Sequence, residues 1–183
     1  MRTPSRERAG DGRTSASASP SVSASPSPQV GTSLYDPVTY APQVRTWAQQ
    51  AGVSAQLVMA ILYNEAYKPD AAFGIANMHR AIFDEVKKDR DFADRRWDEL
   101  PDDRDLAVEA EAWYLHDLHD LAAQLPATRH TFLSEDDLLA LGYNTGAGNM
   151  LAFARGTTPG SQAQSYLDRL HANWAEAGKA VAG

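Results

Sequence analysis

The run LVMAILYNEA, residues 57–66, decides the fold. It is apolar on nearly every side, and Ser54 stands just before it with a hydroxyl that can cap a helix. A helix of this composition is stable only where other elements cover all of its faces. The run therefore predicts a central, buried helix that ends near Glu65.

Helical periodicity continues on both sides of this run. Before it, Asp36-Pro37 is a helix-start signal, and apolar side chains then recur at spacings of three and four from Tyr40 to Gly52. After it, further helices are expected over about 78–88, from Pro101-Asp102 towards Pro126, from Ser134, and from Ser161, where Gln164 would complete a capping box. No convincing period-two strand pattern appears, so the sequence predicts an all-α fold.

The glycine-bearing segment GYNTGAG, residues 142–148, is expected to be a turn between two helical pieces. The mixed-charge run KKDRDFADRRWDELPDDRD, residues 87–105, is expected to be a solvated loop between helices.

The first 33 residues differ from the rest of the chain. They contain nine serines, four prolines and no aromatic residue, and such a composition cannot bury a core or propagate a helix or strand. We therefore expect a disordered tether at 1–33 and one folded domain at 34–183. A domain of about 150 residues can bury roughly two thirds of its unfolded surface.

Charge and composition exclude several classes of function. The chain carries a net charge of −7, and the tether contributes +2 from four arginines against Glu7 and Asp11, which leaves −9 on the domain. A surface for nucleic acid is not expected, because phosphate binding needs clustered Lys and Arg. Cysteine is absent, which removes disulfides, thiol catalysis and Cys-ligated zinc. No apolar stretch reaches the roughly 18 residues of a membrane span. We also expect the protein to be a monomer.

Glu65 is the unexpected residue of the central helix, because it places a carboxyl on an apolar face. It follows Ile61 by four residues and Leu57 by eight, so it continues an apolar face near the helix C-terminus. Loss of water and the negative end of the helix dipole both favour a protonated carboxyl there. Such a group suits general acid catalysis. The alternative is that Glu65 faces solvent where the helix frays before Lys68-Pro69.

Four segments in order extend this observation: LVMAILYNEAYKPD (57–70), FGIANMH (73–79), LLALGYNTGAGNM (138–150) and SYLDRLHANW (165–174). Their succession over about residues 40–175 resembles the soluble lytic transglycosylases of the goose-lysozyme-like group. In that family a buried helix ends in a catalytic glutamate and is followed by a Gly-Leu-Met-Gln segment and an Ala-Tyr-Asn-x-Gly turn. The resemblance implies a lysozyme-like helical domain.

The resemblance assigns roles residue by residue. Glu65 matches the catalytic acid and base, and Tyr143 and Asn144 match residues that line the cleft beside the bond being cut, with Gly146 closing their turn. The stretch 74–78 matches the Gly-Leu-Met-Gln segment, which makes Gly74, Ile75, Asn77 and Met78 expected substrate-binding residues, with Asn77 in the place of the glutamine.

The chain also departs from the family pattern. Ala66 stands where the family usually has serine, Asn77 is one methylene shorter than glutamine, and the connection from Glu65 to Gly74 is short.

The implied substrate is the glycan strand of bacterial peptidoglycan. In the family, the glutamic acid protonates the β-1,4 bond between N-acetylmuramic acid and N-acetylglucosamine and then accepts the proton of the 6-hydroxyl, which closes a 1,6-anhydro ring. No cofactor and no metal are implied. We expect an extracellular or cell-wall location and, because no secretory signal is recognisable, an export segment missing from this version of the chain.

Other readings stay open at this point. A glycosidase of the usual kind needs two carboxyl groups, and Asp70 is the nearest second acid in the sequence. A hydrolytic muramidase, a catalytically silent peptidoglycan-binding module and an interaction bundle unrelated to sugars are the alternatives.

Histidines and tryptophans add weaker candidates. His116 and His119, with Asp117 and Asp120, have a spacing that would fit a metal site but is more typical of a solvated helix face. His79 is expected to cap a loop. Four tryptophans could stack on sugar rings, although two or more are expected in the core: Trp47, Trp97, Trp113 and Trp174.

Overall fold

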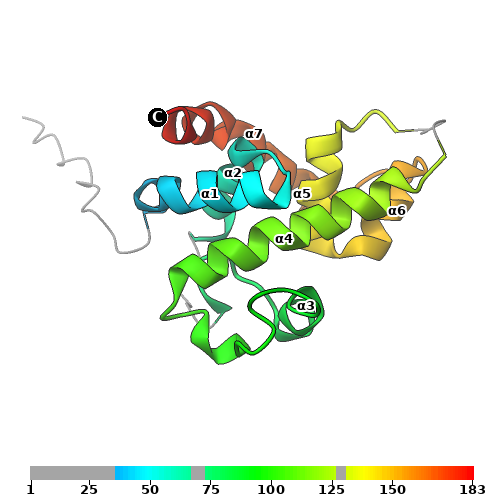
Figure 1. Ribbon diagram of the computed structural model, residues 1–183. Coiled ribbons are helices and arrows are strands. Elements are labelled where there is room, and N and C mark those ends of the chain that lie inside the picture. Colours follow the sequence, from blue (N-terminus) through cyan, green and yellow to red (C-terminus); the bar gives the residue numbers. More distant parts are fainter. Residues whose placement is uncertain (1–35, 67–72, 127–130) are drawn as a thin grey trace, which may run out of the picture. The chain divides into compact units, whose positions relative to one another are not determined.

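The computed structural model describes residues 36–66, 73–126 and 131–183 (Figure 1). Within these ranges the chain forms seven α-helices and no strand, which confirms the all-α prediction for them. The tether expected at 1–33, the domain boundary at Leu34 and the candidate acid Asp70 lie outside the described residues.

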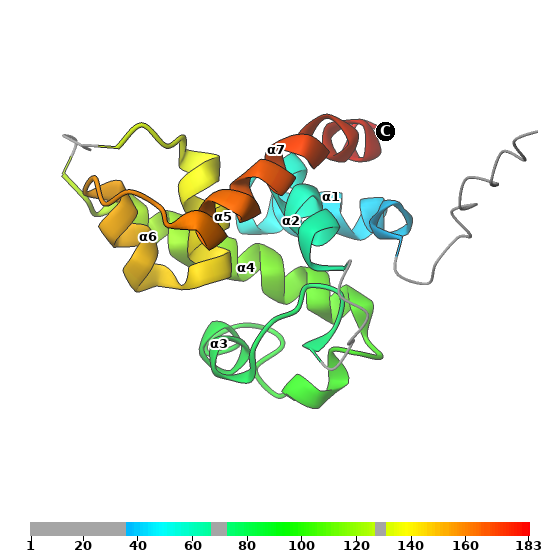
Figure 2. The ribbon, with the colours of Figure 1, turned by 180° about the vertical axis from the view of Figure 1, so that it is seen from behind.

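The elements in chain order are the short 3-10 helix η1 (Pro37–Tyr40), α1 (Ala41–Ala51), α2 (Ala55–Glu65), α3 (Arg80–Val86), the 3-10 helix η3 (Trp97–Glu99), α4 (Arg104–Ala123), α5 (Glu135–Thr145), α6 (Ala147–Ala154) and α7 (Ser161–Val181). Helix α2 packs along α7, α1 lies against α4, and α5 pairs with α6 (Figures 1 and 2). In the described ranges, no helix combines the length and apolar character that crossing a bilayer requires.

Helix α2 occupies the centre of the core, as its composition predicts. The Ser54 hydroxyl caps it by accepting a hydrogen bond from the backbone N–H of Leu57 at 3.2 Å. All six side chains from Leu57 to Leu62 are fully buried, because α1, α4 and α7 each contact α2. The position of Glu65 is therefore set by the most constrained helix of the domain.

Gly52 ends α1 at the predicted residue. Its φ of +69° is a left-handed conformation that glycine adopts without penalty, and its N–H bonds to the carbonyls of Ala48 and Gln49. The sharp reversal brings Ser54 into its capping position only two residues later.

The turn predicted at 142–148 is wrong in extent. Helix α5 continues through Tyr143 and Asn144 to Thr145, and only Gly146, at φ +92°, separates it from α6. Gly142 serves packing rather than a turn, because a Cβ there would lie 2.8 Å from the Met150 sulfur. Tyr143 and Asn144 therefore stand on a rigid helix end.

The start of α7 and the start of α3 also differ from expectation. Gly160 is the N-cap of α7 and Ser161 its first helical residue, so the predicted capping box is absent, and Gln164 donates instead to Asp168 at 2.9 Å. Helix α3 begins at Arg80 rather than near 78, because the preceding residues form a separate tight turn.

The run 87–105 is more ordered than a solvated loop. Arg95 pairs with Glu99 at 2.6 Å and with Asp103 at 2.5 Å around η3, and Asp103 also caps α4 by accepting from the N–H of Leu106 at 3.0 Å. Opposite charges spaced four and eight residues apart thus organise the connection into α4.

Candidate active site

Glu65 is the last residue of α2 and is only 3% exposed. That burial rules out the alternative in which the side chain faces solvent as the helix frays. Asn64, its neighbour, is also buried and donates from its amide to the carbonyl of Tyr166 at 3.2 Å, while Asn173 donates to the Asn64 side chain at 3.3 Å. These bonds tie the end of α2, next to Glu65, to α7.

The segment 74–78 forms a tight turn beside that carboxyl. Gly74 has φ +73°, and a Cβ there would come within 2.8 Å of the Leu100 carbonyl oxygen, so only glycine fits. The indole N–H of Trp97 holds the other end of the turn by donating to the Met78 carbonyl at 2.8 Å. The side chains of Ile75 and Met78, both expected to bind substrate, are 3% exposed and belong to the core.

Asn77 makes the decisive contact of this turn. Its amide donates to Oε2 of Glu65 at 3.0 Å, and its backbone is left-handed at φ +49°. Asparagine tolerates this conformation better than other non-glycine residues do. The short asparagine side chain therefore reaches the Glu65 carboxyl.

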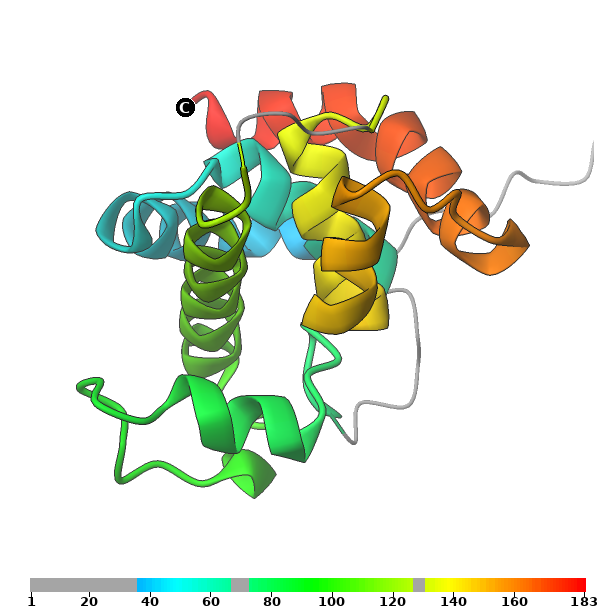
Figure 3. The ribbon, with the colours of Figure 1, turned by 90° about the vertical axis from the view of Figure 1, so that its right-hand side faces the viewer.

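Tyr143 connects the turn to α5. Its hydroxyl donates to the Ala76 carbonyl at 2.7 Å, and its ring packs on Tyr114 with centroids 5.5 Å apart. Figure 3 shows the segment before α3 running up to the end of α5, where this bond forms. Burial, and then the negative charges of Glu111 and Glu65, raise the pKa of the Tyr143 phenol well above its ordinary range. Asn144, the next residue, is exposed.

Two residues of the site were not predicted as functional from the sequence. Tyr166 of α7 is 2% exposed, and burial together with the charge of Glu65 raises the pKa of its phenol well above the ordinary value. Glu111 of α4 is 0% exposed, and burial followed by the charge of Glu65 raises its pKa well above 4.5. The signal for Glu111 was present in its helical spacing, four residues before Leu115 and seven before Leu118 on the buried stripe.

A polar groove opens next to this cluster. Its volume is about 340 Å³ and its wall includes Asn144 from α5 and Tyr166 and Arg169 from α7, with Ser161, Gln162 and Ser165 completing the lining. Hydroxyl, amide and guanidinium groups give this wall several hydrogen-bond donors and acceptors. Tyr166 thus belongs to the groove and also interacts electrostatically with Glu65, and Asn144 lines the groove.

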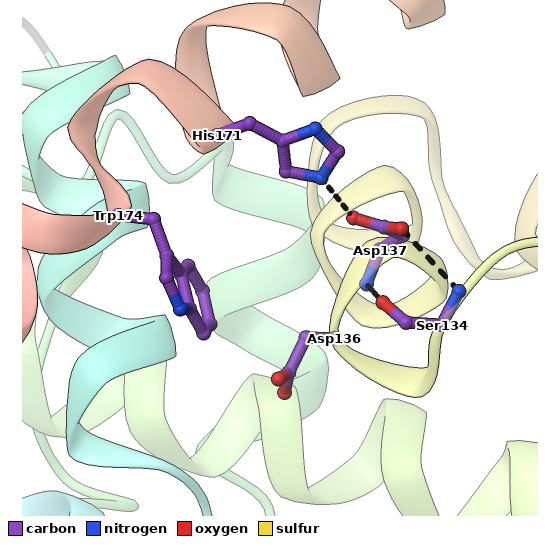
Figure 4. A pocket seen from close by; sticks show the side chains of 5 residues that line it. All are labelled: Ser134, Asp136, Asp137, His171 and Trp174. Carbon is purple, nitrogen blue, oxygen red and sulfur yellow. Dashed lines mark hydrogen bonds and ion pairs between the residues drawn. The ribbon is translucent and has the colours of Figure 1, made fainter.

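A second pocket, of about 390 Å³, lies between the start of α5 and the middle of α7 (Figure 4). His171 points at Asp137, with Nε2 and Oδ1 2.6 Å apart, and Trp174 stands across the pocket from Ser134 (Figure 4). The Ser134 hydroxyl is occupied as the α5 cap, since it accepts from the N–H of Asp137 at 3.1 Å. None of the site residues assigned from the family resemblance lines this pocket, although His171 and Trp174 belong to the segment 165–174.

The histidine pair on α4 is used for contacts between helices. His116 Nδ1 lies 2.7 Å from the Ala51 carbonyl, and His119 Nε2 lies 3.2 Å from Glu135 of α5. Across the described ranges, no three His, Asp or Glu side chains are grouped to hold a metal ion. His79 is exposed at the start of α3, where its ring lies 4.9 Å from that of Phe73.

All four tryptophans are partly buried and pack against the core. Trp47 donates to Asp105 at 3.1 Å, and Arg90 stacks over Trp113 at 4.9 Å. Trp174 is the one of the four that lines a pocket together with α5 residues.

Comparison of the chain with family models, with curated proteins and with solved structures gives no match. The functional assignment therefore depends on the site itself.

Proposed function

We propose that this protein is a peptidoglycan lytic transglycosylase that acts with Glu65 as its acid and base. The observation that carries the proposal is the hydrogen bond from Asn77 to a Glu65 carboxyl that is 3% exposed. Tyr143 anchors the same turn through the Ala76 carbonyl. Two segments that resemble the family thus meet at one buried carboxyl and a third bonds to the same turn, although 78 positions separate Glu65 from Tyr143.

The proposed reaction needs one carboxyl that changes its protonation state twice. Glu65 gives its proton to the glycosidic oxygen as the bond from that oxygen to the anomeric carbon breaks. The resulting carboxylate then takes the proton of the 6-hydroxyl while that oxygen bonds to the anomeric carbon. The products are a free hydroxyl on one sugar and a 1,6-anhydro ring on the other, and Glu65 is protonated again.

The single-carboxyl scheme differs from that of most glycosidases, which place two catalytic carboxyls against the sugar. Asp70, the second acid that the sequence suggests, lies outside the described residues. Ring closure by the substrate's own hydroxyl requires no second carboxyl.

The proposed partner is the glycan strand, which the polar groove beside Asn144 would bind through short-range sugar contacts. The net charge of −9 expected on the domain would repel anionic wall polymers. Wall binding should therefore persist or strengthen at moderate salt. Since peptidoglycan lies outside the cytoplasm, the proposed place of action is the cell wall.

The silent-module alternative depends on the short connection from Glu65 to Gly74 and on the departures at Ala66 and Asn77. The Asn77 amide nonetheless reaches the Glu65 carboxyl at 3.0 Å, and this contact favours the active enzyme over the silent module.

Digestion of purified peptidoglycan followed by mass spectrometry of the muropeptides tests the proposal. We expect 1,6-anhydro ends, which are lighter than reducing ends by one water, and no products from the Glu65→Gln variant. Reducing ends would make the protein a muramidase. Wall binding without any products from the wild type would make it a binding module and end the proposal.

A further inference from the structure

The polar groove beside Asn144 has an unusual balance of charge. Arg169 is the one charged residue among its described lining, which otherwise consists of amides, aliphatic hydroxyls and the Tyr166 phenol, and none of these described residues is an acid. The pocket between α5 and α7, in contrast, is lined by Asp136 and Asp137. On a domain with an expected net charge of −9, a groove of this composition favours a polar ligand that carries negative charge.

The Arg169 guanidinium forms no ion pair with another described residue. Arg90 and Arg95, in contrast, each lie within 2.6 Å of an acid. Neighbours on a helix surface are three or four residues apart, and the four such neighbours of Arg169 carry no charge: Ser165, Tyr166, Ala172 and Asn173. The adjacent Asp168 accepts a hydrogen bond from Gln164 at 2.9 Å. The charge of Arg169 is therefore not needed for a contact within the described structure.

The ring of Tyr166 holds this guanidinium at the groove. The Cζ atom of Arg169 lies 5.8 Å from the centroid of that ring, which is a cation–π distance. Tyr166 is only 2% exposed, so its ring is a fixed support. A guanidinium is a planar group with N–H donors along its edge. Contact with a ring supports the guanidinium without using those donors in a hydrogen bond to an acid.

Two hydrogen bonds connect the walls of the groove to the Glu65 site. On one wall, the carbonyl of Tyr166 accepts from the amide of Asn64, the residue just before Glu65, at 3.2 Å. On the other wall, Asn144 follows Tyr143, whose hydroxyl bonds at 2.7 Å to the turn beside Glu65. A glycan strand that reaches the Glu65 carboxyl along this groove therefore passes the guanidinium on α7.

We propose that Arg169 determines specificity by binding a carboxylate of the glycan strand. This inference rests on the function proposed above. A carboxylate fits a guanidinium because the two can form a pair of parallel N–H···O hydrogen bonds. The strand carries such groups in two forms, namely the lactyl carboxylate of N-acetylmuramic acid where no peptide is attached, and the carboxylates of attached peptides.

The activity test compares three variants on strands with free carboxylates and on strands whose carboxylates have been converted to primary amides. Arg169→Gln should lower kcat/KM about 10- to 100-fold on the free carboxylates, as expected for lost hydrogen bonds to a charged group, and should match the wild type on the amides. Arg169→Lys keeps the charge without the planar donors and should recover part of the loss. Arg155→Gln, the same change at an exposed residue outside the described groove lining, is the matched control and should leave kcat/KM unchanged on both.

Two further substrates identify which carboxylate is bound. Peptide-free strands carry only the lactyl carboxylate, whereas in fully peptide-bearing strands that group is consumed in an amide bond. A loss in Arg169→Gln confined to the first substrate assigns the lactyl group, and a loss confined to the second assigns the peptide. Equal kcat/KM of Arg169→Gln and the wild type on all free carboxylates, or the same loss on amidated strands, would overturn the proposal.

A binding measurement separates this inference from the proposed function. Glu65→Gln and the double variant Glu65→Gln with Arg169→Gln are sedimented with free and with amidated strands, so that cleavage does not affect the result. We expect Glu65→Gln to bind free strands about 10- to 100-fold more tightly than the double variant does, and both to bind amidated strands equally. If this preference is found but the wild type forms no wall products, the proposed function fails and the carboxylate site stands. If anhydro products form without any preference for carboxylates, the site fails and the proposed function stands.

Discussion

The acids at the end of α2 and those at the start of α5 occupy opposite environments. Glu65 and Glu111 are 3% and 0% exposed and lie close enough that the charge of one raises the pKa of the other. Asp137, in contrast, accepts from the backbone of Ser134 at 3.3 Å and contacts His171 at 2.6 Å, at the positive end of a helix dipole. Both regions combine acids with a pocket, but the first holds a carboxyl, that of Glu111, which is fully buried without a hydrogen-bond partner among the described residues.

This difference teaches that the larger pocket is not the better candidate site. The pocket between α5 and α7 holds about 390 Å³ and the groove beside Asn144 about 340 Å³. In the larger one, the Ser134 hydroxyl and the Asp137 carboxyl already serve as helix cap and ion-pair partner. Perturbed acids that no structural pair accounts for are the stronger sign of chemistry.

The largest expected effect separates the two regions by activity. Glu65→Gln should lower the rate of wall cleavage by at least about 10²- to 10⁴-fold, because it removes the transferable proton. Asp137→Asn, the matched change in the other region, should cleave close to the wild-type rate. Turbidity clearing of a peptidoglycan suspension measures both, and equal losses would erase the distinction between the regions.

The next effect concerns the rigidity of the turn at Glu65. Gly74→Ala should lower the free energy of unfolding by about 2–5 kcal/mol, since it adds left-handed strain and a clash with the Leu100 carbonyl. Gly52→Ala is the control: its φ is +69° but nothing lies within 4 Å, so about 1–2 kcal/mol is expected from strain alone. Urea unfolding compares the two, and equal losses would mean that the turn can shift.

A smaller effect isolates the amide at Glu65. Asn77→Gly should reduce kcat by about 10- to 100-fold through loss of a hydrogen bond to a charged group. Stability should change little, because glycine adopts φ +49° freely. Asp89→Gly, at φ +60° on the surface, makes the same backbone change far from the chemistry and should leave kcat intact. Steady-state kinetics with thermal melts would reveal any purely structural role.

The stability of the buried pair should depend on pH. Unfolded Glu111 loses its proton near its ordinary pKa of 4.5, whereas the folded group keeps it, so the unfolded state binds fewer protons above that pH. Stability contributed by this group is thus full below pH 4.5 and is lost as pH rises. Above pH 4.5, the free energy of unfolding of Glu111→Gln should therefore rise relative to that of the wild type by up to about 1.4 kcal/mol per pH unit.

Melting temperatures of both proteins between pH 4 and pH 8 check this expectation. The Glu109 carboxyl, whose pKa is raised to about 7, is present in both and cancels in the difference. A difference that does not vary with pH would show that Glu111 ionises normally.

The smallest effect is expected in the α5 pocket. His171→Ala should cost less than about 1 kcal/mol, because the His171 side chain that contacts Asp137 is more than half exposed. Thermal melts of the variant and the wild type measure the loss. A loss well above about 1 kcal/mol would contradict an exposed contact as the source of this stability.

Much of the local structure could be predicted because its causes are local. The Ser54 cap, the Gly52 stop and the Ser134 cap depend on residues within a few positions of one another, and the structure has all three. The wrong predictions arose where a glycine served packing, as at Gly142, or where a nearby residue supplied the cap, as Gly160 does for α7. Those choices depend on neighbours that a sequence pattern does not name.

The sequence by itself determined that the helix ending near Glu65 is buried, because its apolar residues lie on nearly every side. Only the tertiary structure decided that Glu65 itself is buried and which residue contacts it. Asn77 follows 12 residues later and reaches the Glu65 carboxyl through a left-handed turn. Such contacts between distant residues are set by helix packing. Packing depends on the shapes of whole helix faces rather than on the spacing of residues along one segment.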